Sequence, residues 1–560
     1  MQAFGQAPYW LTAESLKTLE SGYLLPGETP GQLYQRVANA AAARLGRKDL
    51  AIKFFQYIWN GWLCPSTPVA SNMGTARGMP ISCFATHMGD SVDNIFKTIH
   101  EMAMLSKNGG GVAVVLSDIR GRGANIAGNG VSEGIIPWAR IVDVTTLAVS
   151  QGSTRRGATS LYLDIEHPDI EEYLQIRKPL GDVNRQCLNL NHAVVIRDSF
   201  MKKLEDGDEK ARKLWEDLLS TRHDTGEPYI MFYDNVNNAN PQCYKDRGLT
   251  VETSNLCCEI QLHTSKDFTF VCCLSSLNLS KYDEWKDTDL VETSIYFLDG
   301  VMEEFLAKSK DVPGFERAWN FANKSRALGL GVLGWHTYLQ EHEIEFNSFK
   351  AMQLTTKIFK ALREDADCAT AQLAKQYGEP EWLEGYGRRN THTLAIAPTF
   401  STATIAGNVS QSIEPLSANA FIKKQAKGVF IQKNTTLGKV LSKYGMDTDE
   451  VWTDIVVNDG SVQHLKFLSD KEKAVFLTAR ELNQLDIVKQ AALRQRFIDQ
   501  GQSLNLFFPA NADEKFIHAV HMEAWRLGIK TLYYFRSESV LKGDIASRAF
   551  DTQNCTACEG

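Results

Sequence analysis

The sequence lacks several features that would assign it to a cellular location or a partner class. Its N-terminal stretch MQAFGQAPYWLTAESLK has no basic start followed by an apolar run, so no secretory signal peptide is predicted. No apolar run reaches the roughly 18–20 residues of a membrane span. The formal net charge of -7 leaves no basic excess to neutralise phosphates, which excludes a general nucleic-acid-binding protein. We therefore expect a cytoplasmic protein that binds neither membrane nor nucleic acid.

Cysteine is too sparse for a disulfide scaffold, with 11 residues in a chain of 560. In a reducing cytoplasm, cysteines that matter are expected to be catalytic, redox-active or metal-binding. The final segment QNCTACEG holds Cys555 and Cys558 in a C-x-x-C pair without the second pair or the histidines that zinc would need. We therefore predict a dithiol that cycles between reduced and disulfide forms, and no metal site.

The pattern along the chain predicts an α/β protein. Hydrophobic residues make up 43% of the sequence and charged residues 23%, the balance of a globular chain with a sizeable core. Residues 11–63 have a helical pattern, residues 64–84 are predicted as loop, and a helix is expected over 91–106. Strand candidates then alternate with helical stretches, which favours a largely parallel sheet or barrel. These candidates are GGGVAVVLSD, TSLYLDI, HAVVI, YIMFY, FTFVCCL, HTLAIAP, SLNLFF and KTLYYF.

The stretch SNLCCEIQLH, residues 254–263, places two cysteines side by side. In an extended chain Asn255, Cys257 and Glu259 would share one face, and Cys258 would point to the other. One thiol would then lie between an amide and a carboxylate, and the other would be a small apolar filler. We predict that Cys257 takes part in the chemistry and that Cys258 packs in the core.

Several segments resemble the large subunit of class I ribonucleotide reductases. They occur in that family's order: STPVASN with SCF downstream, SNLCCEIQL, CLSSLNL, APTFSTATIAG followed by SIEP, KTLYYFR, and the C-terminal cysteine pair. The resemblance runs from about Pro65 to the last residue. It implies a ten-stranded α/β barrel of two antiparallel-related five-stranded parallel halves, with an N-terminal helical segment. The expected parts are a helical region without an ATP-cone (1–63), the catalytic barrel (64–536) and a flexible redox tail (537–560).

The resemblance also implies a radical mechanism that converts ribonucleotides, with diphosphates expected, into 2′-deoxyribonucleotides. Cys257 would become a thiyl radical and abstract the ribose 3′-hydrogen. Glu259 would act as general base towards the 3′-hydroxyl, and Asn255 would hydrogen-bond the substrate hydroxyls. A carboxylate in a buried pocket suits this task, because desolvation raises its proton affinity.

Two further thiols would supply the electrons that this reduction needs. The resemblance pairs Cys83 with Cys272, while the neighbouring Cys273 leaves that assignment open. Taken singly, each of these cysteines is more typical of core packing. The two reducing thiols would need Cα atoms within roughly 7 Å. Cys555 and Cys558 would re-reduce them by thiol–disulfide exchange, with thioredoxin or glutaredoxin as the donor.

The adjacent aromatics Tyr533 and Tyr534 would relay the radical from a separate, metal-containing small subunit. No cofactor would then be bound in this chain. Two alternatives stay open: a single-chain reductase that depends on adenosylcobalamin, and a non-catalytic nucleotide-binding homologue.

Substrate phosphates would be bound at APTFSTATIAG, where Thr399, Ser401 and Thr402 open a helix whose N–H groups and hydroxyls suit an anion. Thr67 of STP is placed nearby by the resemblance. Phe400 departs from the family, where a small or acidic residue is usual.

Nucleotide effectors, dNTPs or ATP, would be bound by Asp90 and Arg120, and a loop with Arg155 would relay effector identity to the substrate site. Without an ATP-cone, no shut-off of overall activity by dATP is expected. The chain would be a monomer or a homodimer. Its compactness resembles short phage reductases, so the compartment would be the host cytoplasm if a virus encodes it.

Overall fold

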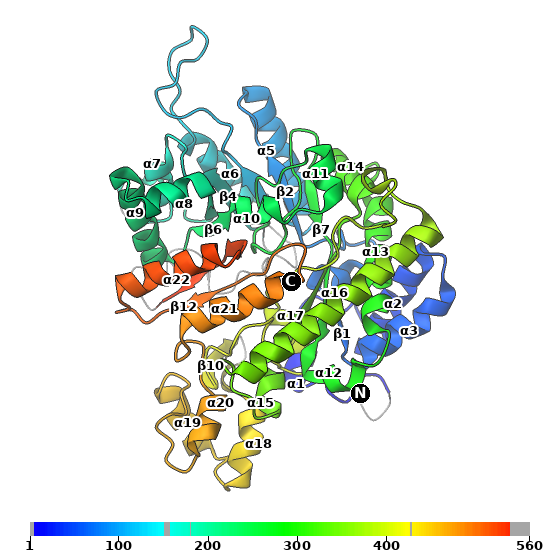
Figure 1. The fold of residues 1–560 in the computed structure, drawn as a ribbon. Helices are drawn as coiled ribbons and strands as arrows, with labels where there is room; N and C mark the ends of the chain where they lie inside the picture. Colours follow the sequence, from blue (N-terminus) through cyan, green and yellow to red (C-terminus); the bar gives the residue numbers. More distant parts are fainter. Residues whose placement is uncertain (1–4, 150–156, 180, 426–427, 538–560) are drawn as a thin grey trace.

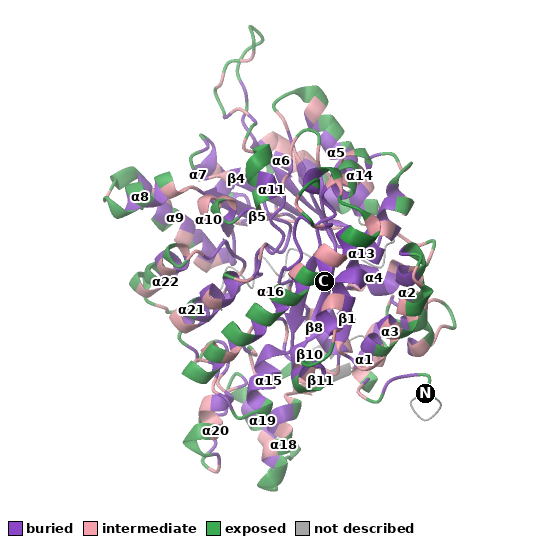
Figure 2. Ribbon diagram, turned by 45° about the vertical axis from the view of Figure 1, so that its right-hand side comes forward, coloured by how far each residue is buried: buried purple, intermediate pink, exposed green. Residues whose placement is uncertain are grey.

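The computed structural model describes residues 5–149, 157–179, 181–425 and 428–537. Along the chain it has an N-terminal group of helices, a closed barrel with helices outside it, and a small peripheral lobe (Figure 1). Buried residues gather on the central strands, and exposed residues lie on the outward faces of the helices (Figure 2). In the described part of the chain, no helix is both long and apolar enough to cross a bilayer.

The N-terminal helices pack against one side of the barrel. Thr29 caps the second of them, because its hydroxyl accepts from the Gln32 N–H and the Gln32 side chain accepts from the Thr29 N–H. That helix lies very close to α13, where a Cβ at Gly300 would be 2.6 Å from the carbonyl oxygen of Ala41. The elements are α1 (Ala13–Glu20), α2 (Pro30–Arg44), α3 (Lys48–Trp59) and α13 (Leu290–Ser309).

The first half of the barrel is a sheet of five parallel strands in the order β6-β5-β4-β3-β2. These strands are buried on both faces, as helices cover the outside, and they read as continuous apolar runs. The strands are β2 (Cys83–His87), β3 (Gly111–Val115), β4 (Thr159–Asp164), β5 (Asn191–Ile196) and β6 (Tyr229–Phe232). The helices between and after them are α5 (Val92–Lys107), α6 (Ile136–Val149), α7 (Ile170–Gln175), α8 (Asp198–Glu205), α9 (Glu209–Thr225), α10 (Tyr233–Asn238) and α11 (Gln242–Arg247).

The second half consists of five parallel stretches, several of them interrupted. β7 is followed at once by β8, which pairs with β9. Isolated β-bridges then join Leu330 to Leu394 and Ile396 to Gln502. The last pairing is that of β12 with β14. β7 runs antiparallel to β2, and β13 runs antiparallel to β6, so the two halves close on each other. The described strands thus form the expected ten-stranded α/β barrel. The strands are β7 (Phe270–Cys272), β8 (Leu274–Asn278), β9 (Gly329–Leu333), β12 (Leu506–Phe507), β13 (Thr531–Leu532) and β14 (Phe535–Arg536).

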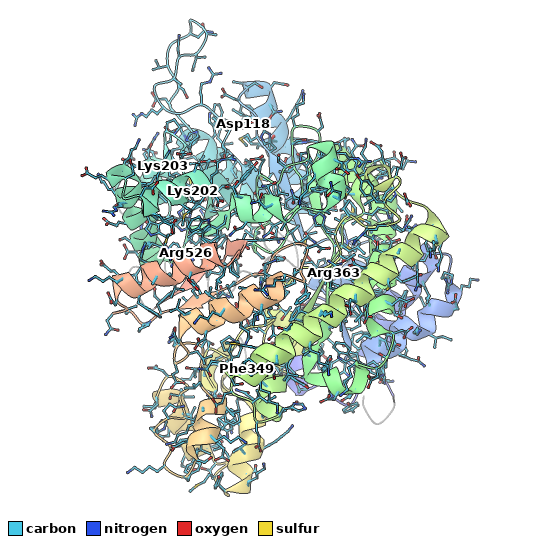
Figure 3. All side chains as sticks on the ribbon, viewed as in Figure 1. Asp118, Lys202, Lys203, Phe349, Arg363 and Arg526 are labelled. Atoms are coloured by element: carbon cyan, nitrogen blue, oxygen red, sulfur yellow. The ribbon has the colours of Figure 1, made fainter. Side chains whose placement is uncertain are left out.

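Helices also cover the second half, and one side chain from them fixes an irregular stretch of the barrel. Arg363 lies on the long helix α16 (Figure 3). It bonds Asp499 at 2.8 Å. Asp499 in turn accepts from the backbone N–H groups of Thr393 and Leu394. These hydrogen bonds hold residues 393–394 in the barrel, where strand pairing consists only of isolated bridges. The helices are α12 (Tyr282–Trp285), α14 (Glu316–Ser325), α15 (Trp335–Glu341), α16 (Phe349–Tyr377), α17 (Phe400–Ile405), α21 (Gln484–Gln495) and α22 (Glu514–Arg526).

Residues 64–84, predicted as loop, contain regular structure, so that prediction is wrong. They hold most of β1 (Leu63–Pro65), which pairs with β8, then α4 (Thr67–Asn72) and the start of β2. The segment carries several Pro, Gly and Ser residues, and tertiary pairing overrides their turn preference.

A small lobe with its own apolar core extends from the barrel (Figure 1). Leu437, Leu441, Trp452 and Ile455 are buried at its centre. The sequence prediction gave this region no separate role. Its elements are β10 (Ala420–Gln425), β11 (Gly428–Lys433), α18 (Thr435–Lys443), α19 (Asp449–Val457) and α20 (Asp470–Val475).

Candidate active site

The segment 254–260 is a tight loop inside the barrel. The extended conformation predicted for it is therefore wrong. Cys258 has a φ of 68°, and the Asn255 side-chain oxygen accepts from the backbone N–H groups of Glu259 (3.0 Å) and Ile260 (3.1 Å). An asparagine side chain that bonds nearby backbone competes with strand pairing and closes a turn instead. The loop still brings the Asn255 amide and the Glu259 carboxylate together.

The loop is tied to both halves of the barrel. From β4, the Tyr162 hydroxyl donates to the Asn255 carbonyl at 2.8 Å. From the second half, Ser503 donates to the Cys257 carbonyl at 2.5 Å and Thr531 to the Cys258 carbonyl at 2.6 Å. These cross-links hold the backbone of the two cysteines at the centre of the barrel.

Glu259 is fully enclosed and hydrogen-bonded on both carboxylate oxygens. Asn255 donates to one oxygen at 2.9 Å and Ser503 to the other at 3.1 Å. Burial and the nearby Cys83 thiol raise the pKa of Glu259 to about 8, although the bonds from Asn255 and Ser503 lower it. The carboxyl group therefore exchanges its proton near neutral pH, which suits a general base.

Cys83 and Cys272 face each other across an antiparallel pair of strands. They are register partners where β2 meets β7, and the two thiols are hydrogen-bonded. Directly opposed antiparallel residues have Cα atoms about 4.5–5.5 Å apart, within the range of a disulfide. Burial, then the bond to Cys83, raises the pKa of the Cys272 thiol. The Cys272 thiol thus stays protonated at neutral pH, close to Cys83 and Glu259.

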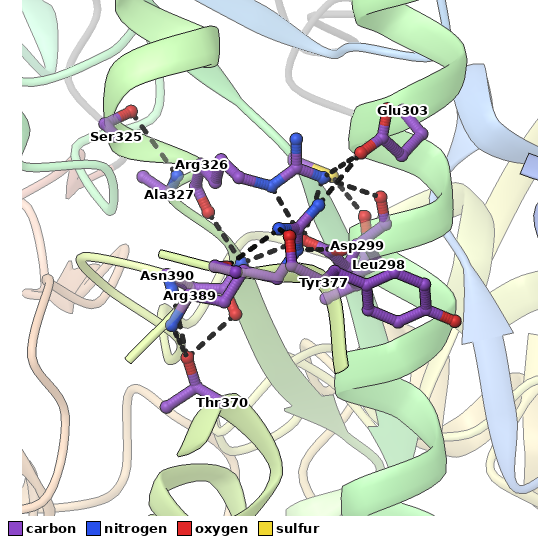
Figure 4. A network of polar contacts seen from close by, with 12 residues as sticks. Leu298, Asp299, Glu303, Ser325, Arg326, Ala327, Thr370, Tyr377, Arg389 and Asn390 are labelled. Atoms are coloured by element: carbon purple, nitrogen blue, oxygen red, sulfur yellow. Dashed lines mark hydrogen bonds and ion pairs between the residues drawn. The ribbon is translucent and has the colours of Figure 1, made fainter. Parts of the chain in front are cut away.

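Cys273 faces the opposite way. Its thiol donates to the Leu298 carbonyl on α13 at 3.5 Å. Beside it, Asp299 is bound by Arg326 and Arg389 in a buried ionic network (Figure 4). Of the two adjacent cysteines, the structure brings Cys272 to Cys83.

Tyr533 and Tyr534 lie in the gap between β13 and β14. Their ring centroids are 4.3 Å apart, and the Tyr229 ring lies 4.8 Å from Tyr533 and 5.0 Å from Tyr534. Tyr533 is buried and Tyr534 is partly exposed. Thr531, two residues before Tyr533, bonds the loop that carries Cys257. The pair thus connects the surface with the interior.

The residues predicted to bind phosphates lie at the starts of two short helices. Thr399 precedes α17, where Ser401 and Thr402 are buried in the first turn, and Thr67 opens α4. The Thr399 hydroxyl already accepts from the Ser412 N–H at 2.8 Å.

Two nearby serines are relevant to the same predicted phosphate site. Among the described residues, the hydroxyls of Ser66, which precedes α4, and Ser412 are buried without a hydrogen-bond partner. Buried polar groups are normally satisfied, so these two hydroxyls are available to a bound anion.

Asp90 and Arg120 form an ion pair of 2.7 Å at the end of the first half-barrel. Asp90 lines a cavity of about 550 Å³ together with His87, Asn94, Ser117, Glu252 and Lys266. Arg155, Cys555 and Cys558 lie outside the described residues.

Two features of the site were missed by sequence reasoning. Ser503 holds both Glu259 and the Cys257 backbone, and Tyr229 contacts both tyrosines of the pair. Each lies in a predicted apolar strand, and only the closure of the barrel reveals its contact. Among the described residues, no group of three His, Cys, Asp or Glu side chains could hold a metal ion.

Comparison with known proteins gives a consistent result. A model of the ribonucleotide reductase barrel domain matches residues 81–210, 207–385 and 380–535, and one of the all-alpha domain matches residues 9–78. A putative ribonucleoside-diphosphate reductase large subunit of Frog virus 3 is 41% identical, with 98% of this chain and 99% of that protein covered. The large subunit of Invertebrate iridescent virus 3 is 35% identical, with 98% of both chains covered.

A solved structure supports the same relationship. The class Id ribonucleotide reductase alpha subunit of Actinobacillus ureae superimposes with a TM-score of 0.88 at 43% identity, over 96% of this chain and 99% of that one. The chain belongs to the family of class I ribonucleotide reductase large subunits, the catalytic subunits of the oxidoreductase that makes deoxyribonucleotides.

Proposed function

We propose that this chain reduces ribonucleoside diphosphates by thiyl-radical chemistry at Cys257. The Cys257 thiyl takes the 3′-hydrogen of the ribose as an S–H bond forms, and Glu259 takes the 3′-hydroxyl proton. The 2′-hydroxyl then leaves as water. Cys83 and Cys272 give up two electrons and two protons and form a disulfide. Glu259 returns its proton to the 3′-oxygen and Cys257 finally returns its hydrogen to C3′, so the 3′-hydroxyl and the thiyl radical are both restored.

One observation carries this proposal: a protonatable carboxylate and two opposed thiols share one enclosed space. Glu259 is bonded by Asn255 and Ser503 and lies within electrostatic reach of Cys83, which faces Cys272. An enclosed site limits side reactions of a reactive intermediate, and these groups are buried. We propose that Asn255, whose amide nitrogen donates to Glu259 at 2.9 Å, also bonds a substrate hydroxyl.

The radical is proposed to enter through Tyr534 and Tyr533 from a small subunit that generates it, so this chain binds no cofactor of its own. The contact between the two rings and the partial exposure of Tyr534 support this route. The same proposal gives Cys555 and Cys558 the re-reduction of the inner disulfide, with electrons from thioredoxin or glutaredoxin. Thiol reductants of this kind fit the cytoplasm, or that of a host.

The remaining assignments concern binding. We propose that the substrate phosphates bind between α4 and α17, at Thr67, Thr399, Ser401 and Thr402. The unpartnered hydroxyls of the neighbouring serines support this place.

We further propose that a nucleotide effector binds the cavity at Asp90, with Arg120 and Arg155 contributing. Arg120 is paired with the Asp90 carboxylate at 2.7 Å, and a guanidinium group that binds a carboxylate can also bind a phosphate.

The substitution Cys257→Ser tests the mechanism, because a serine hydroxyl does not donate its hydrogen atom readily. With the small subunit, a thiol reductant and the four ribonucleoside diphosphates, we expect turnover to fall by about a thousandfold or more. Substrate affinity, measured by equilibrium binding, should stay unchanged.

The matched control is Cys368→Ser on the exposed face of α16, which should keep full activity. Normal deoxyribonucleotide formation by the Cys257→Ser protein would overturn the proposed mechanism.

A further inference from the structure

A buried polar cluster lies against Tyr534. Asn191, the first residue of β5, directs its side-chain nitrogen to the Glu227 carboxylate at 2.6 Å and to the Tyr534 hydroxyl at 3.3 Å. Glu227 stands two residues before β6, and its second oxygen accepts from the His192 N–H at 3.0 Å. Of these residues only Tyr534 has a role in the proposed mechanism.

Glu227 is an anion in this cluster. Burial raises its pKa, but the nearby Arg177 guanidinium and the bond from the His192 ring outweigh burial, so the pKa of Glu227 lies below its usual value. Arg177 approaches the carboxylate to 3.7 Å, and burial keeps the pKa of His192 low. The charge that balances Glu227 therefore comes from Arg177.

The charge on Glu227 fixes the orientation of the Asn191 amide. An ionised carboxylate only accepts hydrogen bonds, so the NH2 group of Asn191, and not its oxygen, must face Glu227. The same NH2 group then has its second hydrogen directed to Tyr534. Because that nitrogen cannot accept, the phenolic hydrogen of Tyr534 points away from Asn191.

We infer that Asn191, held by Glu227, is a positioning residue that donates a hydrogen bond to the Tyr534 oxygen before and after Tyr534 is oxidised. The inference rests on the proposed radical relay. In that step the O–H bond of Tyr534 breaks, its electron passes to the one-electron oxidant of the small subunit and its proton to water at the partly exposed ring edge. The phenoxyl oxygen has no hydrogen and only accepts, so it keeps the bond from Asn191. A hydrogen atom from the Tyr533 hydroxyl then restores Tyr534.

The first test removes the donor. In the complex with the small subunit, Asn191→Ala should lower kcat about tenfold, the effect of one lost hydrogen bond, with KM unchanged. With 3-aminotyrosine at position 534 as an easily oxidised radical trap, the largest g-value in the EPR spectrum should rise, because that value falls when the radical oxygen accepts a hydrogen bond. Asn184→Ala, at an exposed site after β4, is the matched control and should change neither readout.

The second test reverses the polarity of the pair. In the double variant Asn191→Asp with Glu227→Gln, the new amide can still bond the new carboxylate, so the melting temperature should stay near that of the parent. Tyr534 would then face an acceptor in place of a donor, and kcat should fall at least as far as in Asn191→Ala. The 19F chemical shift of 3-fluorotyrosine at position 534 should change in the isolated chain, which needs no small subunit.

The outcomes separate this inference from the relay itself. If Tyr534→Phe keeps full turnover, the proposed relay is wrong. If Tyr534→Phe abolishes turnover while the folded double variant keeps its kcat, g-value and 19F shift, the positioning role alone is wrong. Should the double variant fail to fold, an unchanged g-value in Asn191→Ala overturns the inference by itself.

Discussion

The chemistry of Glu259 depends on a balance between burial and two hydrogen bonds. A base must be unprotonated to act, and the pKa of Glu259 is raised to about 8 by burial and by Cys83. We therefore expect kcat/KM to rise with pH up to about 8 and then to level off, as the ionised fraction grows. Replacement by glutamine, Glu259→Gln, should lower the rate by about 10²–10⁴-fold and abolish this pH dependence.

Ser503 provides the control for that profile. Ser503→Ala removes a donor that favours the ionised carboxylate, so the rise should move to higher pH without abolishing turnover. A profile that is identical in the parent and in both variants would show that another group titrates.

At this scale the sequence predicted the identity of the chemical residues better than their geometry. The order Asn255, Cys257, Glu259 suggested a shared strand face, whereas Cys258 adopts a positive φ and the segment turns back on itself. Asn255 and Glu259 meet because an asparagine side chain closes the loop. Ser503 could not be predicted, since its partner is 244 residues away in the sequence.

At the scale of elements, the pairing of β2 with β7 decides which thiol reduces the substrate. Alternation along a strand sends Cys272 and Cys273 to opposite sides, and the register puts Cys272 against Cys83. After one turnover without reductant, we expect a disulfide between Cys83 and Cys272, found by mass mapping of unreduced peptides. Cys272→Ser should stop multiple turnover, and Cys273→Ser should not; a disulfide to Cys273 would contradict the register.

The ionic network behind Cys273 joins α13 to the end of α14 and to residues 389–390. Asp299 is buried between Arg326 and Arg389, and Asn390 also donates to it at 3.0 Å (Figure 4). Asp299→Ala would leave two buried guanidinium groups without their shared carboxylate. We expect the free energy of unfolding to fall by about 3–5 kcal/mol, measured by urea denaturation.

The pH dependence of the free energy of unfolding provides a second test of this network. Burial raises the pKa of Asp299, but the two arginines outweigh it and the pKa is lowered overall. Its stabilisation is therefore present at neutral pH and is lost as the pH falls through the folded-state pKa. Glu364→Ala on α16, which breaks an exposed ion pair to Lys360, should change the stability by less than about 0.5 kcal/mol.

The strands were predictable from the sequence where they form uninterrupted apolar runs, as in β3 to β6, and not where turn-forming residues surround them or where the pairing is irregular. β1 and β2 were hidden by the Pro, Gly and Ser of residues 64–84, and HTLAIAP forms only isolated bridges. Such stretches are strands because the closed barrel supplies partners, which no local pattern encodes. The peripheral lobe, residues 420–476, was missed for a related reason: its core is built from short amphipathic helices that resemble ordinary surface helices.

For the whole molecule, the exposed apolar side chains of α5 and α6 suggest how two copies meet. Val92 and Phe96 on α5 are 63% and 51% exposed, and Val144 and Leu147 on α6 are 57% and 49% exposed. The Phe96 ring packs edge-on against Trp138 at 6.4 Å, so the two helices form one surface. Contiguous apolar surface of this kind commonly marks an interface, and α5 follows directly on Asp90 of the proposed effector cavity.

We expect the chain to form a homodimer through α5 and α6. Phe96→Asp places a charge in the middle of that contact, where burial without a partner is unfavourable, and should shift the dimer to monomer. Analytical ultracentrifugation over a range of concentrations measures this directly.

The matched control is Phe349→Asp at the start of α16, where the ring is 75% exposed and lies away from α5 (Figure 3). Because the effector cavity adjoins α5, effector binding should weaken with the dimer in Phe96→Asp and stay normal in Phe349→Asp. Dimers that persist in Phe96→Asp would place the contact between copies elsewhere on the molecule.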